Sequence, residues 1–278
     1  MFARLTSRAL IAVTGEDWRS FLQGQLTQNV ETLAVGEARF GALLTPQGRL
    51  LFDMFIIGRE DGCWLDVEAD QRAALIQRLS IYKLRAKVSF NALDLPISAH
   101  PDESRDPGLS SQHSAGQSFP LAFAGVSGVW VRDPRLKALG WRGYGVKGED
   151  DEAAYDRHRL TLGVPGPADW GSDRTYPIEA NFDLLNGIDF KKGCFVGQET
   201  TSRMKRRGQV KNRMLPITFD GPPPPFGTEV LNGERRAGEV LSGQDGVAMA
   251  LLRLDRLAGE LTVEGRRVSV REPAWFAG

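Results

Sequence analysis

The sequence predicts an α+β fold, in which helices pack on antiparallel sheets. In the first half, strand-like and helix-like segments follow one another without the regular strand–helix alternation of a doubly wound parallel sheet. After four consecutive prolines at 222–225, the pattern changes to short strands and tight turns, which is typical of a small antiparallel barrel or sandwich. We therefore expect two interleaved α+β modules over residues 1–215 and a β domain over 216–278.

The N-terminal segments predict a strand, a helix and a meander in that order. Residues 9–13 indicate a short strand, which runs into Thr14-Gly15-Glu16-Asp17, a helix N-cap of the capping-box type. The helix expected over 17–26 places Trp18 and Phe21 near one face. The next segments are strands at 39–45, 50–57 and 63–67, a Pro-x-Gly turn at 46–48, and a helix at 71–82 capped by Asp70.

The later segments predict two further strands, a loop, and then elements of the β domain. In chain order they are strands at 87–90 and 95–99, a polar surface loop at 101–118, an edge strand at 129–132 and a helix at 150–162. Asn232-Gly233 between two strand-like runs is a strong hairpin signal, and Glu264-Gly265 is a weaker one.

Composition excludes several classes of protein. The chain has 35 Lys+Arg and 35 Asp+Glu, so a protein that coats nucleic acid through overall positive charge is excluded. Two cysteines and three separated histidines give no support to a disulfide scaffold or a self-contained metal site. No apolar run is long enough for a membrane helix. The first 14 residues faintly resemble a transit peptide, but their strand pattern favours mature protein in a reducing, cytoplasmic setting, or the mitochondrial matrix in a eukaryote.

The segment around Cys194 is the most informative for chemistry. Lys191 and Lys192 precede this thiol, and a helix is expected to begin near Gly197; nearby cations and a helix start both favour the reactive thiolate. The alternative is an inert cysteine beside a turn, which is the usual role of a lone cysteine in a reducing compartment. Cys63, in an alternating strand next to an aromatic residue, is expected to pack in the core.

Positive charge gathers in the same region. Eight lysines and arginines lie between residues 191 and 213, against the single acid Glu199. Such a run is usually a solvated helix face. It could also hold an anionic small molecule or an acidic protein partner, and the absence of interleaved aromatic residues from 196 to 213 disfavours direct nucleic-acid binding.

Residues 192–199 (KGCFVGQE) match the K-G-C-[FY]-x-G-Q-E signature of the YgfZ family, folate-binding relatives of the glycine-cleavage T-protein, an aminomethyltransferase. Further segments resemble the family in the same order, with Asn29 where the family has Asp: residues 21–29, 45–49 with Asp53, 82–85 and 177–181. The resemblance implies a T-protein-like modular fold with ferredoxin-like antiparallel modules around a central folate cavity, followed by the small C-terminal barrel.

The resemblance also implies a function. Members of the family bind tetrahydrofolate and support assembly or repair of iron–sulfur clusters in client enzymes, and loss of the family has been linked to a tRNA thiomethylation defect. Cys194 would then be the functional thiol and Lys192 the residue that tunes it. Glu179 would accept hydrogen bonds from the pterin, and the further folate contacts implied are Asp53, Gln198, Tyr82 and Arg85.

Departures from the T-protein pattern bear on whether the protein is an enzyme. Phe52-Asp53 stands where T-proteins have two aspartates, so true glycine cleavage is not expected. Asp53 could face folate or lie on the solvent side of a hairpin. A folate-dependent one-carbon transferase and a thiol-dependent tRNA-modification factor stay as alternatives to the assembly factor. The expected partners are folate and iron–sulfur client or assembly proteins, with no membrane.

Overall fold

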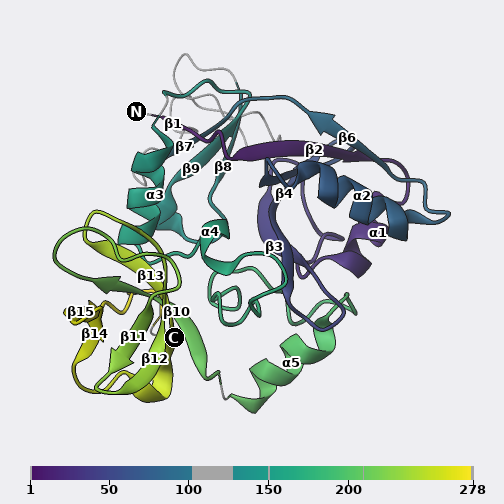
Figure 1. Cartoon of the computed structure of the whole chain (residues 1–278). Coiled ribbons are helices and arrows are strands. Elements are labelled where there is room, and N and C mark those ends of the chain that lie inside the picture. The colour runs from purple at the N-terminus through teal and green to yellow at the C-terminus, as the bar shows by residue number, and fades with distance from the viewer. Residues whose placement is uncertain (1, 102–127, 150, 209, 277–278) are drawn as a thin grey trace. The chain divides into compact units, whose positions relative to one another are not determined.

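The computed structural model describes residues 2–101, 128–149, 151–208 and 210–276 (Figure 1). From residue 102 on, the loop expected at 101–118 lies outside these described residues. The chain divides into two compact units. The first unit comprises residues 1–44, 52–155 and 185–196, and the second comprises residues 45–51, 156–184 and 197–278.

A five-stranded antiparallel sheet organises the first unit. Its strands lie in the order β3-β4-β5-β2-β6. β2 pairs with β5 along its whole length, from Arg8 opposite Glu68 to Thr14 opposite Gly62. The strands are β2 (Arg8–Thr14), β3 (Ala38–Leu44), β4 (Leu50–Arg59), β5 (Gly62–Glu68) and β6 (Ser89–Leu93).

Helices α1 (Trp18–Gln25) and α2 (Arg72–Lys83) pack on this sheet through one apolar core. Leu22 of α1 and Leu79 of α2 are fully buried in it, as is Cys63, which confirms the core position expected of that cysteine. Burial raises the pKa of the Cys63 thiol well above its ordinary value.

The two predicted helix caps are wrong in detail. The capping box expected at residues 14–17 does not form, because Asp17 is itself the N-cap residue of α1, and its carboxylate accepts a hydrogen bond from the Lys87 N–H at 2.8 Å rather than from the helix start. The N-cap residue of α2 is Gln71 rather than Asp70. Both helices therefore begin where expected without the expected side-chain caps.

A second, four-stranded antiparallel sheet completes the first unit. Its order is β1-β7-β9-β8, so β8 is an edge strand, as predicted. The strands are β1 (Ala3–Arg4), β7 (Ile97–His100), β8 (Val129–Arg132) and β9 (Trp141–Tyr144), with the 3₁₀ turn η1 (Lys137–Leu139) between β8 and β9. Helix α3 (Glu152–Thr161) follows this sheet in the chain.

The second unit contains a closed six-stranded barrel, in the order β10-β13-β12-β11-β14-β15. This resolves the choice between barrel and sandwich, and the barrel begins at residue 212 rather than 216. Both predicted hairpin turns are confirmed. The strands are β10 (Asn212–Thr218), β11 (Glu229–Asn232), β12 (Arg235–Gln244), β13 (Val247–Arg253), β14 (Leu261–Val263) and β15 (Arg266–Val270); the helices are α4 (Pro167–Trp170), α5 (Gln198–Arg207) and η2 (Leu254–Arg256).

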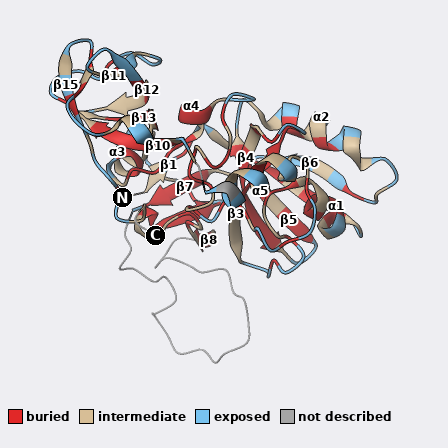
Figure 2. Ribbon diagram, turned by 90° about the horizontal axis from the view of Figure 1, so that it is seen from below, coloured by how far each residue is buried: buried red, intermediate tan, exposed pale blue. Residues whose placement is uncertain are grey.

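The expected α+β class is therefore confirmed, as two antiparallel sheets with helices and a separate β-barrel. Figure 2 shows buried residues running along the strands, with exposed residues on the turns and the outer sides of helices. No helix within the described part of the chain is long and apolar enough to cross a membrane.

Candidate functional site

The loop that carries Cys194 is anchored by its neighbour Lys192. The Lys192 side chain is buried, and its Nζ donates hydrogen bonds to the carbonyl oxygens of Gln23 at 2.7 Å, Leu26 at 2.5 Å and Gln28 at 2.9 Å. Gln23 lies in the last turn of α1 and Leu26 is its C-cap residue. The final carbonyls of a helix lack partners within the helix and attract cations, so the ammonium both caps α1 and ties the loop to it.

Three more hydrogen bonds join the same two segments. Thr27 donates through Oγ1 to the Gly187 carbonyl at 2.7 Å, and its own carbonyl accepts from the Asp189 N–H at 3.0 Å. The side-chain amide of Gln28 donates to the Asn186 carbonyl at 2.8 Å. These hydrogen bonds therefore hold the 21–29 segment against the start of the 192–199 signature, although the two are far apart in sequence.

The environment of Lys192 lowers its basicity. Burial lowers the pKa of Lys192 to about 8, and the carboxylates of Asp189 and Glu31 oppose this fall. The Phe195 ring centroid lies 5.3 Å from the ammonium. A lysine in this setting remains charged at neutral pH but holds its proton less firmly than an exposed lysine.

Cys194 itself is exposed, in contrast to buried Cys63. Its thiol is open to a reagent or partner, which a functional cysteine requires. The ammonium of Lys192, two residues before it, is directed to the three carbonyls. Lys191 is exposed, and its N–H donates to Asp189 at 2.8 Å. The roles expected of Cys194 and Lys192 stay predictions.

Helix α5 begins at Gln198, directly after Gly197, as predicted. Gly197 has φ 80°, a left-handed conformation that favours glycine. Of the eight cations between 191 and 213, Lys192 and Arg213 are buried and bonded internally, so the solvated charge is smaller than the sequence suggests. Gln198, a predicted folate contact, is the half-buried first residue of the helix.

Glu179 lies in a turn of the second unit. Its carboxylate accepts from the Asn212 side-chain amide at 2.9 Å and from the Tyr176 N–H at 3.1 Å. The backbone of this turn is fixed by Arg213, which donates to the Ile178 carbonyl at 2.7 Å. An ionised carboxylate accepts about four hydrogen bonds, so half-buried Glu179 keeps capacity for a ligand with N–H donors, and its chemistry fits the pterin edge.

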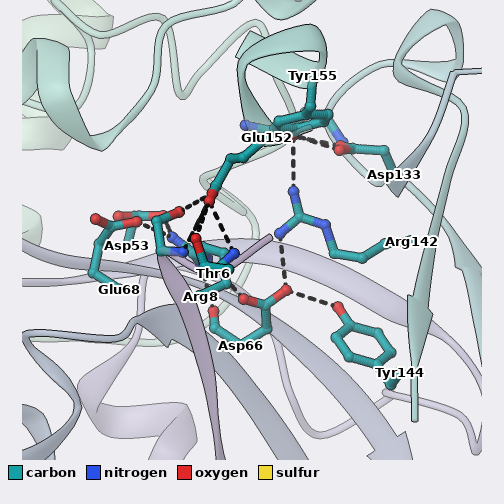
Figure 3. A network of polar contacts seen from close by, with 12 residues as sticks. Thr6, Arg8, Asp53, Asp66, Glu68, Asp133, Arg142, Tyr144, Glu152 and Tyr155 are labelled. Carbon is teal, nitrogen blue, oxygen red and sulfur yellow. Dashed lines mark hydrogen bonds and ion pairs between the residues drawn. The ribbon is translucent and has the colours of Figure 1, made fainter. Parts of the chain in front are cut away.

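Asp53, by contrast, lies in a buried ionic network of the first unit (Figure 3). It is 6% exposed, and the Arg8 guanidinium lies 3.3 Å from its carboxylate. The expected solvent-facing alternative is therefore wrong. Arg8 also pairs with Asp66 at 2.7 Å and with Glu68 at 2.9 Å, so Asp53 shares one cation with two other acids.

The network extends from Asp66 to the second sheet of the unit. Fully buried Asp66 pairs with Arg142 at 2.8 Å and accepts from the Tyr144 hydroxyl at 3.0 Å (Figure 3). Burial alone would raise the pKa of Asp66, but Arg8 and Arg142 outweigh it and hold the pKa below its ordinary value. Burial raises the pKa of Glu68.

Sequence reasoning missed this network, although it left a signal. Asp66 interrupts the otherwise apolar strand Cys63–Val67, and Arg142 lies between Trp141 and Tyr144. A charged residue on a buried strand needs an opposite charge nearby, which the sequence could have flagged without naming the partner.

Tyr82 and Arg85 lie at the end of α2. The Tyr82 ring packs against the core of the first unit, with the Arg78 guanidinium 5.3 Å from its centroid, and Arg85 is exposed. Their folate roles stay predictions. A cleft of about 730 Å³ in the first unit, lined by Arg4, Arg72 and Lys147 among others, contains none of the predicted site residues. No group of three or more metal-binding side chains occurs among the residues described.

Comparisons with known proteins agree with this architecture. Residues 211–278 match the model of the CAF17 C-terminal β-barrel domain. The crystal structure of glycine cleavage system aminomethyltransferase T from Bartonella henselae superimposes with a TM-score of 0.77 over 99% of this chain and 85% of that chain, at 20% identity. The expected T-protein-like fold with a C-terminal barrel is thus confirmed.

Three curated relatives share an assembly function in their names. The human mitochondrial iron–sulfur cluster assembly factor IBA57 is 30% identical over 98% of this chain and 84% of its own length. The mitochondrial IBA57 homologue of Pyricularia oryzae is 31% identical, over 98% of this chain and 76% of its own length. The Neurospora crassa homologue is 35% identical, over 80% of this chain and 54% of its own length. The predicted resemblance is confirmed at this coarser level; the name YgfZ is not the one these relatives bear.

Proposed function

We propose that this chain, which belongs to the family of the iron–sulfur cluster assembly factor IBA57, acts in the assembly of iron–sulfur clusters for client enzymes. Relatives matched over nearly the whole chain carry that function in their names. They are also named as mitochondrial, so they support a mitochondrial matrix and give no support to the cytoplasmic setting expected from the sequence. The partners would be iron–sulfur client or assembly proteins.

The observation that carries a more specific role is the exposed thiol of Cys194 on an anchored loop. A solvent-accessible sulfur held on a fixed backbone suits transient contact with a cluster that is cargo rather than a resident cofactor. One cysteine cannot ligate a cluster alone, so a partner protein or a small thiol would supply the remaining ligands.

The test is complementation of a host that lacks its own copy of the gene, with the activities of several iron–sulfur enzymes as the readout. Cys194→Ala should keep the melting temperature of the wild type, because the side chain is exposed, and should lose rescue. Cys63→Ala is the matched control: it removes a buried thiol, so the melting temperature should fall while rescue persists. Full rescue by Cys194→Ala would remove the thiol from the mechanism.

Tetrahydrofolate binding is a separate part of the proposal, supported by the free acceptor capacity of Glu179. Saturating tetrahydrofolate should raise the melting temperature of the wild type. At a concentration 100 times Kd, the ligand adds about 2.7 kcal/mol to the free energy of unfolding. Glu179→Ala should abolish this shift, and Glu234→Ala, at an exposed barrel position, should not. Asp53, Gln198, Tyr82 and Arg85 are the other predicted contacts. A wild-type protein with no shift would refute folate binding.

Two separate assays distinguish the other functions considered from the sequence. Turnover of folate with an aminomethyl donor would reveal a one-carbon transferase; similarity to aminomethyltransferase T supports the fold alone. A tRNA-modification factor would bind tRNA in a gel shift that persists at moderate salt.

A further inference from the structure

The outer face of α2 carries no charge. Its exposed residues are Ala73, Ala74, Gln77, Ser80 and Ile81, and exposed Leu84 is the C-cap residue of the helix. We call these six residues the α2 ridge. A surface helix ordinarily presents charged or polar side chains to water, and α2 already buries Leu75 and Leu79 on its inner face. Apart from Gln77, the outer face carries only small or apolar side chains, so it lacks the charge that a helix facing water ordinarily presents.

Two large side chains form the exposed end of the ridge. Leu84 is 89% exposed and Ile81 is 62% exposed, which are the highest values among the large apolar side chains described. Single exposed leucines are common on protein surfaces, but here two large exposed apolar side chains lie three residues apart at the end of one helix.

The backbone at Leu84 is also in a conformation that leucine disfavours. Leu84 has φ 45° and ψ −107°, and the Ala86 N–H donates to the Lys83 carbonyl at 2.8 Å. These values match the first central position of a type II′ turn, where glycine is preferred. A glycine would form this turn with less strain. The presence of leucine there therefore indicates that its exposed side chain has a role of its own.

Positive charge predominates around the ridge. From residue 71 to residue 93 the sequence has five lysines and arginines and no acid. Arg72 is paired with Asp94 and Lys87 with Glu16, which leaves Arg78, Lys83 and Arg85 beside the ridge. A partner that covers the ridge would therefore bring acidic residues to surround an apolar contact.

We propose that the α2 ridge docks an acidic protein through an amphipathic helix whose apolar stripe covers Ile81 and Leu84. Alanine and serine in the ridge allow close approach of a second helix. A membrane surface is less well matched, because interfacial helices insert a longer row of large apolar residues than these two. Only the identity of the partner depends on the proposed function: it would be an acidic assembly or client protein.

Site-specific photocrosslinking in the complementation strain tests the ridge. A benzophenone amino acid at position 81 of the full-length protein should form an adduct with an acidic protein, identified by mass spectrometry. The same probe at position 226 is the control, since Phe226 is 52% exposed in the second unit and outside the ridge. The position-81 adduct should exceed the control about tenfold or more and should fall by a similar factor with Lys83→Glu and Arg85→Glu.

A second variant separates docking from folding. Leu84→Gly should leave the melting temperature equal or higher, because glycine suits the turn, yet it should reduce the adduct and the rescue of iron–sulfur enzymes. Equal crosslinking at both positions, no adduct, adducts only with a second copy of the chain, or binding to phosphatidylserine vesicles that depends on Ile81 would each overturn the proposal. If wild-type protein rescues no iron–sulfur enzyme, the proposed function fails, while the adduct still decides the docking site.

Discussion

Replacing Lys192 by methionine isolates the anchor of the Cys194 loop. The variant keeps a side chain of similar length but removes the donor for the three carbonyls of Gln23, Leu26 and Gln28. A buried acceptor without a donor costs about 1–3 kcal/mol, so three such carbonyls cost about 6 kcal/mol at the middle of that range. Losing the buried charge offsets part of this, because a fall of the lysine pKa from 10.5 to about 8 corresponds to about 3 kcal/mol. The expected net loss in the free energy of unfolding is about 3 kcal/mol.

Lys191→Met is the matched control, since Lys191 is adjacent and exposed. Exposed substitutions of this kind change the free energy of unfolding by about 0.5 kcal/mol or less. Urea unfolding followed by tryptophan fluorescence measures both variants, and the rate of Cys194 alkylation measures the loop. If Lys192 acts by holding the backbone, Lys192→Met should change the alkylation rate several-fold more than Lys191→Met.

Two results would refute this reasoning. An unfolding free energy of Lys192→Met within about 0.5 kcal/mol of the wild type would show that the three carbonyls find other donors. Equal slowing of alkylation by both variants would show that positive charge near the thiol, rather than the anchor, controls its reactivity.

Three further predictions concern the framework. Asp66→Asn leaves two buried arginines without their shared carboxylate and should lower the free energy of unfolding by about 3–5 kcal/mol in urea titrations, whereas Glu68→Gln, at the partly exposed edge of the network, should cost about 1 kcal/mol or less. Because the folded protein holds the Asp66 pKa low, the stabilisation that this carboxylate provides is present above the unfolded pKa near 3.9 and is lost as pH falls through the folded pKa. Acid titration of Asp66→Asn should therefore show a shallower loss of stability than that of the wild type. An identical slope would contradict this. Gly48→Ala should lower the melting temperature more than Gly233→Ala: both have positive φ, but a Cβ at Gly48 would lie 3.0 Å from the Gly197 carbonyl oxygen, while one at Gly233 meets open space.

Local signals in the sequence predicted most of the secondary structure. The Asn232-Gly233 turn and the apolar face of α1 depend on neighbours within a few residues, so the chain alone specifies them. The side chain of Asp17 departed from its expected cap because the Lys87 N–H, 70 residues away, competes for the same carboxylate. β1 has two residues and no repeating pattern, and its strand conformation depends on pairing with β7, far away in sequence.

The candidate site was predictable in part for the same reason. Cys194 was found through the residues that flank it in sequence. The partners of Lys192 lie more than 160 residues away and are backbone carbonyls, which no residue type in the sequence reveals. The sequence does not decide whether Asp53 faces a ligand or solvent, because its pairing with Arg8 depends on the register of three strands, which is a tertiary property.

The Arg8–Asp66–Arg142 cluster also determines how the first unit opens. Arg8 and Asp66 belong to the five-stranded sheet, and Arg142 belongs to β9 of the four-stranded sheet. Separating the two sheets would leave a buried carboxylate or guanidinium without its counter-charge. Opening either sheet by itself would therefore cost a large free energy. Amide hydrogens of β5 and β9 should therefore exchange with deuterium in a single cooperative event, making the two sheets one foldon despite their separate hydrogen-bond ladders.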